Sequence, residues 1–145
     1  MAGRLLSIAS AGAAQLAERL AGLIRSGMAH LERLRCVHRD IAARNVLLDE
    51  ALCAKISDFG LSRHVNKKED VYQMRTGAHV AVRWSAPEAI RYQVFDSKTD
   101  MWSFGVTCWE IFSRAATPYA DLSNASKRTV MLSVIGQVKD NTALV

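Results

Sequence analysis

Apolar residues in the first third of the chain recur mostly at intervals of three and four positions. They are Leu16, Leu20, Leu23, Ile24, Met28, Leu31 and Leu34. This spacing is typical of one face of an α-helix, so we expect an amphipathic helix that runs toward Cys36 and Val37. Its apolar face should pack against the rest of the fold.

Two short apolar runs follow, at residues 46–49 and 53–57. Only residues 50–52 separate them, which predicts a small β-hairpin. A longer run from Met101 to Phe112 is apolar nearly all round, and this predicts a helix buried on every side.

The start of this last helix has a capping signal. Ser97 and Asp100 have the Ser-x-x-Asp form of a capping box. Residues 61–83 are polar without sustained periodicity, so we expect a long surface loop with a functional role. Residues 123–145 show apolar residues at roughly helical spacing, but no cap.

Charge and cysteine content narrow the class of partner. The 145 residues carry a net charge of +5 and a pI near 9.4, with the Lys and Arg residues scattered along the chain. The densest pair, Lys67-Lys68, is followed by Glu69-Asp70, which favours a solvated loop over a nucleic-acid site. Three cysteines without a C-x-x-C pair fit a reducing compartment. We therefore expect an intracellular protein with no nucleic-acid partner.

The first residues only loosely imitate a signal peptide. Their apolar run is short, and the charged pair Glu18-Arg19 comes soon after it. No stretch is long enough to cross a bilayer, and Ala2 stands where myristoylation requires Gly. The expectation is a chain without a membrane segment.

Three motifs occur in order along the chain. Residues 38–45 read His-Arg-Asp-Ile-Ala-Ala-Arg-Asn, residues 58–60 read Asp-Phe-Gly, and residues 86–88 read Ala-Pro-Glu. Each tripeptide alone is a weak signal, but Asp58 follows Asp40 by 18 positions, an interval that matches a known layout. The series resembles the catalytic loop, the metal-binding motif and the substrate-loop motif of protein kinases.

Two places resemble protein tyrosine kinases in particular. Ala42 stands where kinases acting on serine or threonine usually carry Lys, and Arg44 follows two positions later. The second place is Val-Arg-Trp-Ser at residues 82–85. A guanidinium at position 44 would supply a phosphate-facing charge and leave room for a phenolic substrate.

The resemblance implies a role for each polar residue of the motifs. Asp40 takes the role of catalytic base, with Arg44 and Asn45 beside it in the catalytic loop. Asn45 and Asp58 hold the two magnesium ions that bridge the ATP phosphates, as hard oxygen ligands suit Mg²⁺. Leu47 forms the floor under adenine. The implied cofactors are ATP and Mg²⁺.

Regulatory and packing roles follow from the same resemblance. Tyr72 lies where the family places its activating phosphotyrosine, and Arg39 is expected to pair with that phosphate. His38 and Phe59 are interpreted as packing residues of an internal apolar spine.

Two further acidic residues have implied structural roles. Asp100 is expected to brace the backbone of the catalytic loop. Glu88 is expected to pair with a buried Arg that the family carries in helices beyond the position of Val145. Loss of one partner of a buried pair costs about 3–5 kcal/mol, so we expect an isolated chain to fold poorly.

The chain also departs from the family. Residues 1–37 contain no G-x-G-x-x-G segment and no V-A-I-K lysine, and Ala81 stands where Pro is usual. We expect three parts: an atypical Ala-rich helical leader at 1–25, a kinase C-lobe at 26–124 and a divergent tail at 125–145. Without the nucleotide-clamping parts, phosphoryl transfer by this chain alone is expected to be weak or absent.

The fold expected from these observations is mainly α with a small β-hairpin, the C-lobe of the α+β protein-kinase fold without its N-lobe. The function implied is ATP-dependent phosphorylation of tyrosine-bearing protein substrates, with a regulatory kinase as a further partner. The expected location is the cytoplasm, or the cytoplasmic side of a membrane for a receptor relative. Two alternatives remain: a non-catalytic kinase-like module that docks partners through residues 76–95, and an incomplete gene product.

Overall fold

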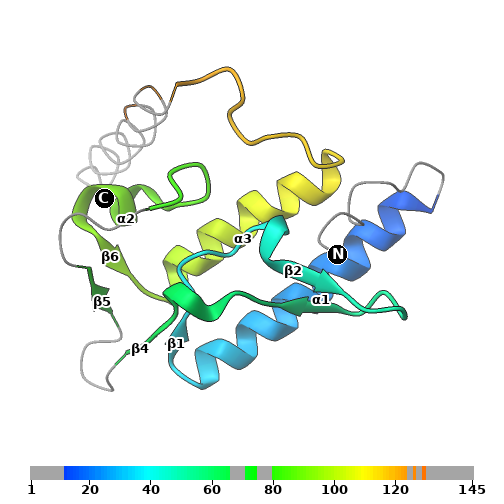
Figure 1. The fold of residues 1–145 in the computed structure, drawn as a ribbon, viewed down its shortest axis with the longest axis horizontal. Helices are drawn as coiled ribbons and strands as arrows, with labels where there is room; N and C mark the ends of the chain where they lie inside the picture. The colour runs from blue at the N-terminus through cyan, green and yellow to red at the C-terminus, as the bar shows by residue number, and fades with distance from the viewer. Residues whose placement is uncertain (1–11, 66–70, 75–79, 124–125, 127–128, 130–145) are drawn as a thin grey trace, which may run out of the picture.

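Two long helices lie side by side in the computed structural model, which describes residues 12–65, 71–74, 80–123, 126 and 129 (Figure 1). The helices are α1 (Ala13–Arg33), α2 (Pro87–Tyr92) and α3 (Ser97–Phe112), with 3-10 turns η2 (Ala43–Asn45) and η3 (Phe59–Leu61). The strands are β1 (Cys36–Val37), β2 (Val46–Leu48), β3 (Ala54–Ile56), β4 (Arg63–His64), β5 (Tyr72–Gln73) and β6 (Val94–Phe95). The described chain is thus rich in helix with small sheets, which confirms the expected class at that level.

Helix α1 follows the predicted apolar pattern. Its buried residues are Ala17, Leu20, Ile24, Met28 and Leu31. Leu34, the last residue of the predicted face, instead lies just past the helix and is 52 % exposed. The helix ends there because Arg35 adopts a left-handed φ of 52°, which turns the chain toward β1. The expected domain division at residue 25 falls inside α1 and stays a prediction, as does the division at 124.

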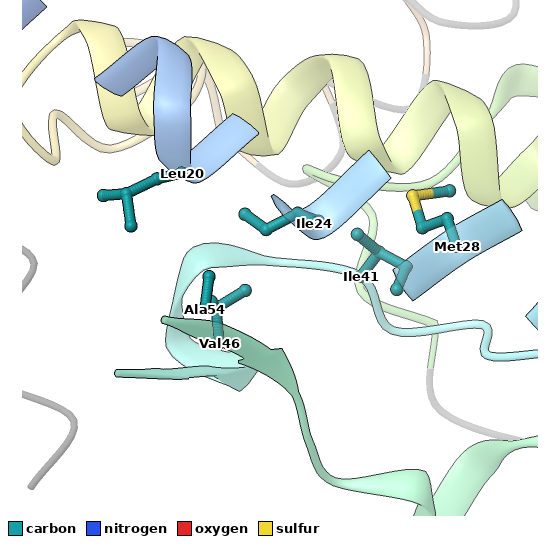
Figure 2. Close-up of a cluster of buried hydrophobic side chains, with 6 residues drawn as sticks. All are labelled: Leu20, Ile24, Met28, Ile41, Val46 and Ala54. Carbon is teal, nitrogen blue, oxygen red and sulfur yellow. The ribbon is translucent and has the colours of Figure 1, made fainter. Parts of the chain in front are cut away.

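The main core joins α1 to the segments that follow it. Leu20, Ile24 and Met28 of α1 form one buried cluster with Ile41 and with Val46 and Ala54 of the β2–β3 hairpin, and Figure 2 draws these six side chains. Ile24 and Ile41 are each 1 % exposed. Because Ile41 belongs to the predicted catalytic loop, burying it fixes that loop on the core.

The predicted hairpin is confirmed. Strands β2 and β3 are antiparallel, with Val46 opposite Ile56 and Leu48 opposite Ala54. The carboxylate of Asp49 accepts hydrogen bonds from the backbone of the connecting turn, which stabilises the reversal.

Two more antiparallel pairs were not predicted. Strand β1 pairs with β4, and β5 pairs with β6. Both β4 and β5 lie within the expected 61–83 loop, so its described parts are held by strand pairing. The charge run at Lys67–Asp70 lies outside the described residues, as does most of the helical pattern predicted after residue 123.

Helix α3 begins with a different cap from the one predicted. Asp96 is the N-cap and accepts a hydrogen bond from Thr99 N at 2.8 Å, while the Thr99 hydroxyl accepts one from Asp96 N. The prediction of Ser97 and Asp100 as the capping pair was wrong by one position. Asp100 turns instead toward the 38–45 loop.

The prediction that α3 is buried on every side was also wrong. Its four buried residues are all polar, whereas Met101, Trp109 and Phe112 are 52 %, 47 % and 53 % exposed. The buried polar residues face loops whose backbone groups need hydrogen-bond partners. Phe104 and Ile111 of α3 pack partly buried against the main core, whereas the described part of the chain leaves Met101, Trp109 and Phe112 open to solvent. Among the described helices, none is both long and apolar enough to span a bilayer.

Candidate active site

The 38–45 loop is anchored to α3 at its beginning. The buried carboxylate of Asp100 accepts hydrogen bonds from His38 N at 2.7 Å and from Arg39 N at 2.9 Å. Burial raises the pKa of Asp100 to about 6, although the two N–H donors act in the opposite direction. The buried acid thus holds two consecutive backbone amides of the loop.

Both carboxylate oxygens of Asp40 have partners within the loop. Asn45 donates from its amide nitrogen to Asp40 Oδ2 at 2.8 Å and to the Asp40 carbonyl at 2.7 Å. Arg44 forms an ion pair with Asp40 Oδ1. Asn45 is 7 % exposed, so its amide is held in one orientation and fixes the direction of the Asp40 side chain.

The 38–45 loop and the Asp-Phe-Gly segment are tied together directly. Ser57 donates from its backbone N and from its hydroxyl to the Asn45 carbonyl, at 2.8 and 2.9 Å. His38 lies between the two segments: its Nε2 is 3.1 Å from the Ser57 carbonyl, and Asp40 N donates to its Nδ1 at 3.3 Å. This arrangement assigns the proton to Nε2.

The His38 side chain is buried against Phe59. It is fully buried, and its ring and that of Phe59 form a T-shaped contact with a centroid distance of 4.9 Å. Burial lowers the pKa of His38, against the raising effect of the Ser57 carbonyl and nearby carboxylates, so the neutral imidazole is favoured. Phe59 itself is 48 % exposed.

Asp58 and Leu47 lie at the exposed side of the same region. Asp58 adopts a left-handed backbone conformation (φ 62°, ψ 67°), and its carboxylate accepts a hydrogen bond from Gly60 N at 3.4 Å. Leu47 is the middle residue of β2, the strand that follows Asn45, and is 46 % exposed. Both side chains can therefore meet a bound molecule.

Asn45 and Asp58 fit the chemistry of a magnesium site. The Asn45 amide nitrogen is used on Asp40, which leaves the amide oxygen as its ligand atom, and Asp58 offers an exposed carboxylate. Within the described ranges, no three His, Cys, Asp or Glu side chains are grouped as a metal site. Magnesium bound with ATP takes part of its ligands from phosphate and water, so two protein oxygens are enough.

The structure brings Arg39 and Tyr72 together, and their expected pairing through a phosphate stays a prediction. The Arg39 guanidinium carbon lies 4.5 Å from the centroid of the Tyr72 ring and 5.4 Å from that of Phe95. Sequence reasoning missed Arg63, whose guanidinium lies 5.9 Å from the same Tyr72 ring. The only signal for Arg63 is its place on β4, a two-residue strand that no pattern revealed.

Glu88 lies in the first turn of α2, directly after Pro87. It forms no ion pair with another described residue, so its expected pairing stays a prediction.

Sequence reasoning also missed Glu110. Its Oε2 accepts hydrogen bonds from Ala43 N at 3.0 Å and from the Trp84 indole at 2.7 Å. The Trp84 ring in turn lies 4.4 Å from the Arg44 guanidinium carbon. In the sequence Glu110 was one polar residue within an apolar run, which hid its role.

Comparison with known proteins agrees with these motifs. The family model for protein tyrosine and serine/threonine kinases matches residues 10–141. The chain is 46 % identical over 101 residues to the human tyrosine-protein kinase Srms, covering 70 % of the chain and 20 % of that protein. It is 50 % identical over 103 residues to tyrosine-protein kinase HTK16 of Hydra vulgaris, covering 71 % of the chain and 14 % of the relative.

A receptor is also among the relatives. Human ephrin type-A receptor 8 is 46 % identical over 118 residues, which are 79 % of the chain and 11 % of the receptor. The chain therefore spans a fifth or less of the length of these relatives. The family predicted from the motifs is confirmed, and the chain belongs to the protein tyrosine and serine/threonine kinase family.

Proposed function

We propose that the chain is the larger, mostly helical lobe of a protein tyrosine kinase and that it carries the site for phosphoryl transfer from ATP to tyrosine. The observation that carries this proposal is the position of Asn45. Its side chain donates a hydrogen bond to Asp40, and its carbonyl accepts one from Ser57, the residue before Asp58. One residue thus joins the proposed base to the proposed metal ligand.

Asp40 is the proposed base. Its carboxylate is oriented by Arg44 and Asn45, so it can accept the proton of a tyrosine hydroxyl as the oxygen attacks the terminal phosphorus. Asn45 and Asp58 would hold Mg²⁺, which neutralises charge on the phosphate oxygens when it is bound with ATP. The exposed Leu47 would contact adenine.

Preference for tyrosine is supported by the residues around Arg44. Its guanidinium is stacked on Trp84, which leads into the Ala-Pro-Glu motif. The three relatives are tyrosine kinases or an ephrin receptor by name. The proposed substrates are proteins that bear tyrosine.

Tyr72 is the proposed phosphorylation site, modified by a partner kinase. Arg39 and Arg63 both lie over its ring, so a phosphate on Tyr72 would meet two guanidinium groups. The location that suits these substrates is the cytoplasm, or the cytoplasmic side of a membrane.

The rate proposed for this chain alone is low. Residues 1–37 lack the glycine-rich segment and the lysine that clamp ATP in kinases. Loss of one preorganised electrostatic contact lowers a rate by about a hundred- to a thousandfold.

The test is transfer of labelled phosphate from ATP to a tyrosine peptide with Mg²⁺, by the chain and by its Asp40→Asn variant. We expect slow transfer that the substitution abolishes, together with a Mg²⁺-dependent rise of the melting temperature on addition of ATP. Transfer that Asp40→Asn leaves unchanged would reject Asp40 as the base. Neither transfer nor an ATP-dependent shift would favour the non-catalytic module.

A further inference from the structure

Helix α3 turns a row of polar residues toward the rest of the molecule. The row consists of Asp100, Ser103, Thr107 and Glu110, at the spacing of one helix face. A helix that packs on a core normally buries an apolar face instead. In α3, Phe104 and Ile111 pack only partly buried against the core, whereas the fully buried positions are polar. This indicates that the polar face binds backbone and side-chain groups of other segments.

Three members of this row bind two separate segments of the chain. Asp100 holds the start of the 38–45 loop, and Glu110 holds its Ala43 amide. Ser103 donates to the carbonyl of Trp84 at 2.8 Å, while Glu110 accepts from the indole of Trp84. Asp100 and Glu110 are ten residues apart on α3, about 15 Å along the helix axis, so they bind opposite ends of the 38–45 loop.

The Glu110 carboxylate is the point where the two segments meet. A single oxygen, Oε2, accepts from Ala43 N and from Trp84 Nε1. These donors lie 41 positions apart in the sequence, and one charged acceptor fixes their positions relative to each other.

From Trp84 the contacts lead to Asp40. The Trp84 ring supports the Arg44 guanidinium at 4.4 Å, and Arg44 pairs with Asp40 Oδ1. Glu110 orients the indole, the indole supports Arg44, and Arg44 holds the carboxylate of Asp40. Of the two carboxylate oxygens of Asp40, Asn45 holds only Oδ2.

We propose that Glu110 is a positioning residue that fixes Trp84 and the end of the catalytic loop, and through Arg44 sets the direction of the Asp40 carboxylate. Its predicted effect on rate rests on the proposed phosphoryl transfer, whereas its effect on the indole and on the Ala43 amide does not.

The first test is proton exchange measured by NMR on the whole chain. The chain has three indole N–H groups, on Trp84, Trp102 and Trp109, which serve as one probe and two internal references. We expect Glu110→Ala to speed exchange at the Trp84 indole and the Ala43 amide at least tenfold. The two reference indoles should change less than twofold.

Two variants provide the comparison. Glu18→Ala removes an acid from the exposed side of α1 and should leave both probes unchanged. Glu110→Gln loses the charge, as Glu110→Ala does, but keeps one acceptor oxygen. It should therefore restore part of the protection, and this result would show that the hydrogen bond matters as well as the charge. If Glu110→Ala does not fold, the test compares amide exchange at Ala43 in Glu110→Gln, in Trp84→Phe and in the variant that combines them. Trp84→Phe keeps a ring under Arg44 but lacks the N–H, so combining it with Glu110→Gln should add less than twofold to exchange at Ala43.

The second readout is the rate of transfer. We expect Glu110→Ala to lower kcat at least tenfold with the KM for ATP changed less than twofold, and Glu110→Gln to recover part of kcat. Unchanged protection in a folded Glu110→Ala variant, or lost protection with kcat intact, would overturn the proposal. Absence of transfer by the wild-type chain would instead count against the proposed function, and the exchange data would still decide the role of Glu110.

Discussion

Asp100→Asn separates two opposing effects at the buried anchor of the 38–45 loop. The carboxylate accepts from both His38 N and Arg39 N, whereas an Asn side chain can accept from only one and turns its own donors toward the other. The substitution therefore loses a charge-assisted hydrogen bond, which stabilises a protein by about 1.5–3 kcal/mol. It also removes a buried carboxylate whose ionised form lowers the free energy of unfolding, because burial takes the charge out of water.

The size of that penalty depends on pH. Burial raises the pKa of Asp100 from 3.8 to about 6, and this difference corresponds to about 3 kcal/mol of destabilisation at pH 7. Because the folded chain retains the proton at higher pH than the unfolded chain, this group makes stability fall as pH rises from about 4 to 6. At pH 5 the penalty is only about half as large.

The two effects nearly cancel at pH 7, where we expect Asp100→Asn to change the free energy of unfolding by no more than about 1 kcal/mol. At pH 5 the variant should be worse relative to wild type by a further 1–2 kcal/mol, approximately. Urea unfolding followed by circular dichroism at both pH values measures this difference. The lowered pKa of His38 has the opposite effect on the pH dependence, because the stability that it contributes is lost as pH falls below 6.5. This contribution is the same in the wild type and the variant, so it cancels in the comparison.

Asp121→Asn, at an exposed position, serves as the matched control and should shift stability equally at both pH values. The reasoning is refuted if Asp100→Asn is equally destabilising at pH 5 and pH 7.

Three other substitutions test the framework that carries the loop, each by urea unfolding. Ile24→Ala should lower the free energy of unfolding by about 2–5 kcal/mol, because Ile24 is 1 % exposed in the core, whereas the exposed Leu34→Ala should change it by less than about 0.5 kcal/mol; equal effects would contradict the core assignment. Asp96→Ala should cost about 1 kcal/mol through loss of the α3 cap, and no change would show that another residue caps the helix. Gly22→Ala should stabilise by about 0.5–1 kcal/mol, since a Cβ there meets nothing within 4 Å in α1, and destabilisation would contradict this open environment.

The sequence predicted those elements whose pattern comes from burying apolar side chains. The α1 spacing and the two runs of the hairpin are of this kind, and both elements form nearly where expected. The pairs β1–β4 and β5–β6 escaped prediction because two-residue strands are too short to show a period. The α3 helix was predicted to exist, but composition could not show that its polar face is the buried one.

The site divides in the same way. Asp40, Asn45 and Asp58 could be named because they stand at fixed places in motifs. Arg63 and Glu110 could not, because their importance arises from contacts between segments that are distant in the sequence. The difference between Asp96 and Ser97 as cap depends on one residue of register, which a pattern does not resolve.

The most direct test of the central claim is paramagnetic line broadening by Mn²⁺ bound with ATP, observed on the amide signals of the chain. If the two motifs form one metal-nucleotide site, the amides of Asn45 and Asp58 should broaden together at a low ratio of Mn²⁺ to protein, and excess Mg²⁺ should reverse the effect. The amide of Gly22, on the exposed side of α1, should stay sharp. Broadening at only one of the two motifs, or equal broadening along the whole chain, would contradict the account.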